Sequence, residues 1–267
     1  MELKRLLNIK YIIIVCAALV LNIILFMFQA TAGGNKINED SKRDLRIRTE
    51  YIENYKSNIQ NIVDRAEKLK KQRLFSNPES FSYKNIIKTG KDYEKLININ
   101  LSADNSKAVR AISKYSMFIG ISAILTLLLM NNLFKERDNN MWQLTYMSKN
   151  GRAYLGLVRI ADIFIISLIQ HCLLYITVVC VSFILFGGLG DLYNPIQNIS
   201  EFGQCTLVIN KAEYLIADFL LTYLSVVVAT SIIYMLMNVF RNRKNVFIGT
   251  GAVSYTHLRA HETSAHL

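Results

Sequence analysis

Four long apolar stretches constrain this chain more than any other feature. They occupy residues 11–30, 117–134, 163–186 and 215–240. Each is close to or above the roughly 20 residues that an α-helix needs to cross a bilayer. Because lipid offers the backbone no hydrogen-bond partners, such stretches span membranes as helices. The sequence therefore predicts an all-α, polytopic membrane protein with four spans.

The first stretch follows a basic leader, an arrangement that cleaved signal peptides share. Its apolar run exceeds the roughly 7–15 residues usual in such a peptide, so we expect a retained anchor. Hydrophobic residues make up 52% of the chain, and 31 Lys and Arg against 20 Asp and Glu give a net charge of +11. This composition agrees with apolar and basic residues that occupy separate segments.

The basic residues beside the short loops predict the orientation. They are Lys4, Arg5, Lys10, Lys135, Arg137, Lys149, Arg152, Arg159, Arg241, Arg243 and Lys244. Short cytoplasmic loops carry such an excess of Lys and Arg. We therefore expect a plasma-membrane protein with a cytoplasmic N-terminus, and with residues 35–114 and 187–211 outside. The outer loop 187–211 contains one base, Lys211.

Residues 35–114 read as a helical extracytoplasmic domain. Apolar residues recur at steps of three and four from Ile52 to Leu69, which predicts an amphipathic helix. A second apolar set from Tyr83 to Ile97 predicts a partner helix that is broken near Gly90. An antiparallel hairpin uses these faces economically, and a homodimeric coiled coil is the alternative.

The charge of this domain leaves two interpretations open. Residues 36–114 carry 18 Lys and Arg against 11 Asp and Glu, or +7. This surface either attracts anionic lipids, wall polymers or peptides, or is a solvated face of mixed charge. We do not expect nucleic acid as a partner, because the domain is predicted outside and carries no recognisable binding motif.

Catalytic signatures are missing from the sequence. It contains no phosphate-binding G-x-x-x-x-G-K-[ST] loop, no H-E-x-x-H and no paired C-x-x-C motif. We therefore expect no enzymatic activity, no catalytic residue, no metal site and no cofactor in this chain. Asn198 and Ser200 form a glycosylation triplet of the kind that arises by chance.

Three polar residues in or at the inner end of the third span form a possible in-membrane polar site, because ionisable groups in spans often serve function. They are Asp162, Gln170 and His171. Simpler explanations are a local ion pair of Asp162 with Arg159, and hydrogen bonds between helices for the other two.

The cytoplasmic segment 135–152 is the most informative part of the sequence. An acid–base pair, Glu136 and Arg137, follows the second span. Apolar Met141, Trp142 and Tyr146 come next, and Arg152 ends a polar turn. By itself this order predicts a short amphipathic helix at the membrane surface.

The same order resembles the permease subunits of type-2 ABC transporters, including Gram-positive examples with a helical ectodomain between spans one and two. The resemblance implies six spans, an acid–base pair that opens a coupling helix, and dimers of identical or different permeases in lipid. It also implies a separate ATPase that binds ATP and Mg²⁺. Glu136, Arg137, Met141, Trp142, Tyr146 and Arg152 would then contact or position that subunit.

The chain is accordingly expected to comprise four regions. Residues 1–34 form the leader and first span, 35–114 the ectodomain, and 115–252 the membrane domain with the start of a fifth span. Residues 253–267 resemble a translated sequencing adapter, which predicts a truncated chain with a non-native tail; a metal-binding histidine tail is the alternative.

Two functions remain open from the sequence. The first is a permease that exports or extracts a hydrophobic or amphipathic substrate with its partner ATPase. The second is a membrane-anchored sensor or scaffold with a ligand-binding ectodomain.

Overall fold

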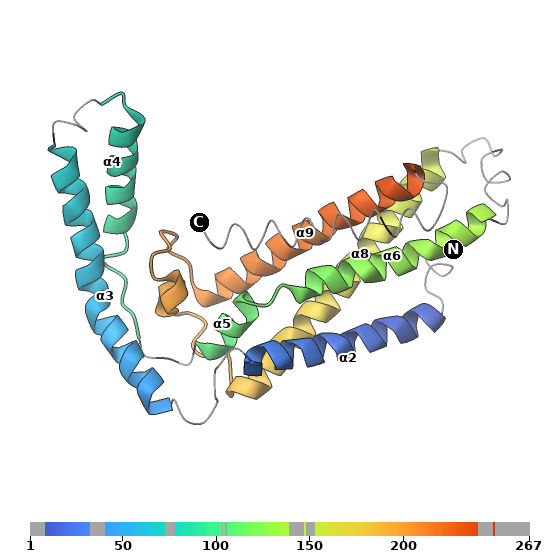
Figure 1. Ribbon diagram of the computed structural model, residues 1–267, viewed down its shortest axis with the longest axis horizontal. Coiled ribbons are helices and arrows are strands. Elements are labelled where there is room, and N and C mark those ends of the chain that lie inside the picture. The colour runs from blue at the N-terminus through green and yellow to red at the C-terminus, as the bar shows by residue number, and fades with distance from the viewer. Residues whose placement is uncertain are drawn as a thin grey trace. The chain divides into compact units, whose positions relative to one another are not determined.

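The computed structural model describes residues 9–32, 41–72, 78–102, 104, 106–138, 147, 153–239 and 248. The helices within this part are α2 (Ile9–Ala32), α3 (Ser41–Lys70), α4 (Phe81–Glu94), α5 (Lys107–Ser113), α6 (Met117–Asp138), α8 (Ala153–Phe186) and α9 (Lys211–Val239), with short 3-10 turns η2 (Ile196–Asn198) and η3 (Ser200–Phe202). Across these ranges the extended pairing is limited to one isolated bridge between Pro195 and Asn210. The predicted all-α class is confirmed for the described chain (Figure 1).

The chain divides into two compact units. Unit 1 comprises Met1–Gln29, Lys114–Val181 and Asp218–Leu267, and unit 2 comprises Ala30–Ser113 and Ser182–Ala217. Unit 2 therefore combines the predicted ectodomain with the segment predicted as a separate outer loop.

Among the described residues, three helices are long and apolar enough to cross a membrane: Ile9–Thr31, Gly156–Phe186 and Lys211–Val239. These contain the first, third and fourth predicted spans. The second predicted span lies in α6, which qualifies only when α5 and Met117–Met130 are counted together as one broken span. The protein is thus a helical membrane protein with three candidate spans, or four with the broken one.

The helices of unit 1 alternate in direction around a shared core. Near one end, the Gln29 side-chain nitrogen donates to the Lys114 carbonyl oxygen at 2.9 Å. Near the other, Tyr11 of α2 shares a buried cluster with Met130, Ile163 and Met237 of α6, α8 and α9. Tyr11 and Ile163 lie in the first third of α2 and α8, whereas Met130 and Met237 lie in the second half of α6 and α9, so successive helices run in opposite senses (Figure 1).

In unit 2, α3 and α4 form the predicted antiparallel hairpin. Tyr55 and Ile59 of α3 pack with Leu96, and Tyr93 lies against this cluster. The predicted break at Gly90 is wrong, because α4 runs continuously from Phe81 to Glu94. Gly90 lies on the face of α4 that packs on α3, where an added Cβ would lie at an ordinary contact distance of 3.5 Å from the Ala66 Cβ.

A second core in unit 2 joins residues far apart in sequence. Val109 of α5 is buried with Ile196 and Ile199 of the predicted outer loop, and Tyr214 of α9 packs against them. The loop begins after α8 with a turn in which Gly187 has a φ of 70°, a conformation that glycine adopts without steric cost. The segment 182–217 is thus part of a folded unit.

Candidate functional site

The structure places the predicted coupling pair in α6. Glu136 and Arg137 belong to the last turn of α6, which ends at Asp138. They were predicted to open a separate short helix, whereas here they continue α6. Met141, Trp142, Tyr146 and Arg152 lie outside the described residues.

Asp162, Gln170 and His171 all lie on α8 and are buried, with exposed fractions of 8%, 3% and 0%. Asp162 precedes Gln170 by eight residues, about 12 Å along a helix. The Gln170 side-chain nitrogen donates to the Tyr11 hydroxyl of α2. His171 contacts Thr222 of α9 instead. The three side chains therefore do not converge on one point, and an in-membrane functional site there stays a prediction.

His171 sits among aromatic rings. Its ring centroid lies 5.1 Å from that of Phe219, 5.6 Å from Phe118 and 5.8 Å from Tyr223. Its Nε2 lies 3.2 Å from the Thr222 hydroxyl oxygen. That hydroxyl also lies 2.7 Å from the Asp218 carbonyl oxygen of its own helix, and the tautomer of the ring decides which atom donates in the contact with Nε2. This contact joins α8 to α9.

Asn22 of α2 is a polar residue that the sequence reasoning missed. Its side chain is fully buried. Its amide nitrogen donates to the Leu174 carbonyl and to the Thr177 hydroxyl, both at 3.1 Å. The Tyr115 hydroxyl donates to the Asn22 side-chain oxygen at 2.7 Å. Asn22 thus joins α2 to α8 and to Tyr115 in the short link between α5 and α6. Its position in an apolar stretch was the available signal.

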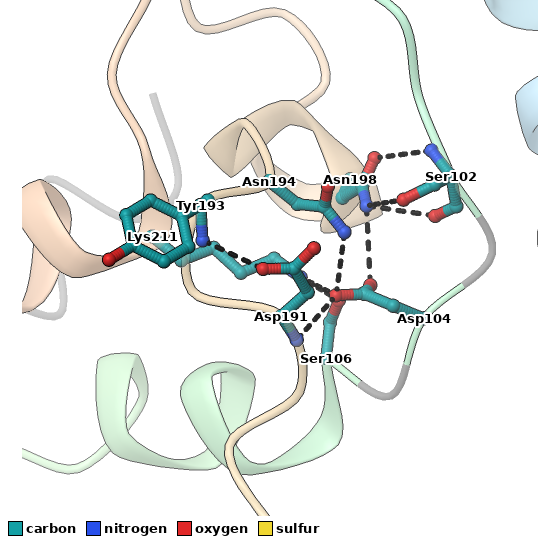
Figure 2. A network of polar contacts seen from close by, with 8 residues as sticks. All are labelled: Ser102, Asp104, Ser106, Asp191, Tyr193, Asn194, Asn198 and Lys211. Carbon is teal, nitrogen blue, oxygen red and sulfur yellow. Dashed lines mark hydrogen bonds and ion pairs between the residues drawn. The ribbon is translucent and has the colours of Figure 1, made fainter.

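The densest polar cluster of the described chain lies in unit 2 around Asp104, and we call it the Asp104 cluster (Figure 2). Its members come from the segment before α5, from the segment between α8 and α9, and from the first residue of α9: Ser102, Asp104, Ser106, Asp191, Tyr193, Asn194, Asn198 and Lys211. These segments are about 90 to 107 residues apart in sequence.

Lys211 and Asp104 form the centre of this cluster. The Lys211 ammonium makes an ion pair with Asp104 Oδ2 and donates to the Ser106 hydroxyl at 2.8 Å. The Lys211 side chain is fully buried, whereas that of Asp104 is 14% exposed. Because a buried charge needs a partner, this contact determines where the two segments meet.

Further hydrogen bonds complete the cluster. The Ser106 hydroxyl donates to Asp104 Oδ1 at 2.8 Å, and the Asn194 amide donates to Oδ2 at 3.2 Å. Burial alone would raise the pKa of the Asp104 carboxyl. The hydrogen bonds from Lys211, Ser106 and Asn194, together with the positive charge of Lys211, lower the pKa by more than burial raises it. The pKa of Asp104 therefore lies below its ordinary value, and the carboxylate is ionised at neutral pH.

Asn198 of the predicted glycosylation triplet also belongs to the cluster. Its amide nitrogen donates to the Ser102 carbonyl at 2.8 Å and to Asp104 Oδ1 at 3.2 Å. Its side-chain oxygen accepts the Ser102 backbone N–H at 3.2 Å. The side chain therefore fixes the loop before α5, a structural role that explains an asparagine at this position without a glycan.

Comparison with known protein families, with curated proteins and with solved structures finds no match to this chain. The function therefore has to be inferred from the residues and their arrangement.

Proposed function

We propose that this chain is the permease subunit of an ATP-driven ABC transporter of the plasma membrane. With a separately encoded ATPase, it exports or extracts a hydrophobic or amphipathic substrate. The observation that carries the proposal is the continuity of α6, which extends an apolar helix directly into the Glu136–Arg137 pair.

The length of α6 supports this role. Counted with α5, the broken candidate span ends at Met130, and α6 continues without interruption to Asp138. Glu136 and Arg137 therefore lie about 9 to 11 Å beyond the end of that span, on the same helix. A continuous helix is stiff, so a force applied to this pair by a partner would move the span itself.

The alternating helices of unit 1 support the proposed orientation. The start of α2, the end of α6, the start of α8 and the end of α9 all belong to one end of the bundle. Those are the segments that carry the excess of Lys and Arg beside the spans. By the charge rule for short loops this end is cytoplasmic, where an ATPase can reach Glu136 and Arg137.

Photo-crosslinking identifies the partner. A photoreactive amino acid replaces Arg137 in membranes of the native host, and mass spectrometry identifies the protein that it captures. We expect a protein with a phosphate-binding G-x-x-x-x-G-K-[ST] loop. The same amino acid at Lys68, an exposed position on α3, serves as the control and should not capture it. Capture of a histidine kinase from Arg137 would favour the sensor function instead.

A coupling assay then tests the mechanism. Glu136→Ala with Arg137→Ala should preserve expression but lower substrate-stimulated ATP hydrolysis by the reconstituted complex to its basal rate. The matched control is Glu67→Ala with Lys68→Ala, which also removes one acid and one base, on the exposed surface of α3. Normal coupling in the first double variant would refute the assigned role of the pair.

A further inference from the structure

Helix α4 has two opposite faces. Gly90 and Tyr93 lie on the face that packs against α3. Four lysines, Lys84, Lys88, Lys91 and Lys95, follow one another at steps of four, three and four residues and are exposed. Lys88 precedes Gly90 by two residues and Lys91 precedes Tyr93 by two, which corresponds to about 200° of rotation around the helix axis. The lysines therefore form one row on the side that faces away from α3.

An open cleft of about 390 Å³ runs along this row. All four lysines line it, together with Tyr83 and Ile87. Both apolar side chains are only partly buried, because α3 covers the other face of α4. The cleft thus combines a row of ammonium groups with an apolar strip.

The charge in this cleft is mostly uncompensated. Asp92 is the single acid in its lining and pairs with Lys95 at 3.0 Å, where the two side chains are 27% and 61% exposed. Among the described residues, Lys84, Lys88 and Lys91 have no ion-pair partner. Three like charges on neighbouring turns repel one another, which disfavours the helix unless an anion binds.

We infer that this cleft binds a linear polyanion, a chain that carries phosphate groups at regular intervals. The row from Lys84 to Lys95 extends over about 16 Å, at 1.5 Å per residue. A single phosphate reaches one or two of these ammonium groups, whereas an extended chain contacts all of them at once. Tyr83 and Ile87 can then pack against the less polar links between its phosphates.

This binding does not depend on ATP-driven transport. The cleft is lined by residues of unit 2 alone, so either proposal can be correct while the other is wrong.

The test uses the full chain in nanodiscs of phosphatidylcholine, which carries no net charge. Fluorescently labelled inorganic polyphosphate is the probe, and its binding is measured by anisotropy at several salt concentrations. The test variant is Lys84→Ala with Lys88→Ala and Lys91→Ala, which keeps the helix favourable because alanine has the highest helix propensity. The matched control is Lys56→Ala with Lys68→Ala and Lys70→Ala on α3, which removes the same charge from exposed positions.

We expect the α4 variant to weaken polyphosphate binding at least tenfold and the α3 variant to change it less than twofold. Each ammonium–phosphate contact contributes about 0.7 to the slope of log affinity against log salt, so the slope should fall by about 2 in the α4 variant. Circular dichroism checks that both variants keep the helicity of the unmodified chain.

Three outcomes would overturn the inference. The first is equal weakening in both variants, which would indicate attraction by overall charge. The second is competition by monomeric phosphate at equal phosphate concentration, which would indicate a site for a single anion. The third is binding to phosphatidylglycerol vesicles that requires the α4 lysines, without any polyphosphate binding, which would indicate a lipid surface as the ligand.

Discussion

Replacing Asp104 by asparagine tests whether the Asp104 cluster holds unit 2 together. The substitution keeps the shape of the side chain but removes its charge. Lys211 then retains a fully buried ammonium group without a counter-ion. Breaking a buried ion pair from one side costs about 3–5 kcal/mol, far more than the pair contributes when both partners are present.

The hydrogen bonds of Asp104 support a value in this range. The donors to its two oxygens come from five residues: Lys211, Asp191 and Asn194 at Oδ2, and Ser106 and Asn198 at Oδ1. In either orientation of the asparagine amide, its NH₂ group faces at least two of these donors and cannot accept from them. No rotation of the new side chain restores the network.

Hydrogen exchange measures the loss locally. The backbone N–H groups of Ile196, Lys211 and Ala212 donate to Ile209, Asn194 and Leu192 within unit 2 at 3.0, 3.0 and 3.1 Å. In Asp104→Asn, we expect their protection to fall by roughly a hundredfold to a few thousandfold, since about 1.4 kcal/mol corresponds to a factor of ten. The second substitution Lys211→Met removes the stranded charge and should restore at least half of the lost free energy.

A matched control is available in the same unit. Glu201 pairs with Arg110, and their side chains are 32% and 35% exposed. Glu201→Gln makes the same carboxylate-to-amide change at a solvated pair, so it should cost less than about 1 kcal/mol. If Asp104→Asn is equally mild, the Lys211 ammonium reaches water and the proposed role of the cluster is wrong.

The pH dependence has a definite sign. The pKa of Asp104 is lowered in the folded protein, so the folded state binds fewer protons there than the unfolded state does. The stabilisation is fully present above the ordinary carboxyl pKa of about 3.9 and is lost as the pH falls through the lower folded value. The difference in protection between the unmodified chain and Asp104→Asn should therefore shrink below about pH 4.

Two further substitutions test the helix contacts. Gly90→Ala should stabilise the α3–α4 hairpin by about 0.5–1 kcal/mol, because alanine favours the helix and its Cβ would lie at an ordinary contact distance from Ala66; Gly90→Leu should destabilise it by overpacking. Asn22→Leu should lower the free energy of unfolding of unit 1 in detergent by about 1–2 kcal/mol, because it removes the hydrogen bonds to Thr177 and from Tyr115. An unchanged free energy of unfolding would contradict this prediction.

Periodicity and hydropathy predicted the elements of this fold well. Each long apolar stretch lies within a helix, because the signal extends over many residues and depends on composition alone. The facing stripes of α3 and α4 were predicted for the same reason, since an amphipathic helix repeats its apolar face at each turn. The break predicted at Gly90 was wrong because the low helix propensity of glycine is a local signal. It carries no information on how α4 packs against a neighbour such as Ala66 of α3.

The Asp104 cluster could not have been predicted in this way. Asp104 lies in a short polar segment that predicts only a loop, and its main partner Lys211 is 107 residues away. Neither residue belongs to a periodic pattern, so nothing in the local sequence distinguishes them from solvated charges. Tyr51 is a similar case: its hydroxyl donates to the Gln197 carbonyl at 3.0 Å, and burial raises its pKa to about 12. Such contacts depend on the tertiary arrangement alone.

The buried position of Lys211 also changes how the charge of the chain is interpreted. Residues 187–211 contain no other Lys or Arg, and this one lysine is held by Asp104. That segment therefore presents no exposed basic residue, whereas the chain before α2, the link between α6 and α8 and the chain after α9 contain many Lys and Arg in the sequence. In residues 36–114, four of the bases behind the +7 charge form one row along α4 and its C-cap residue Lys95. Because charges in a row act together on an extended anion, the distribution of these lysines is functionally more informative than the net charge.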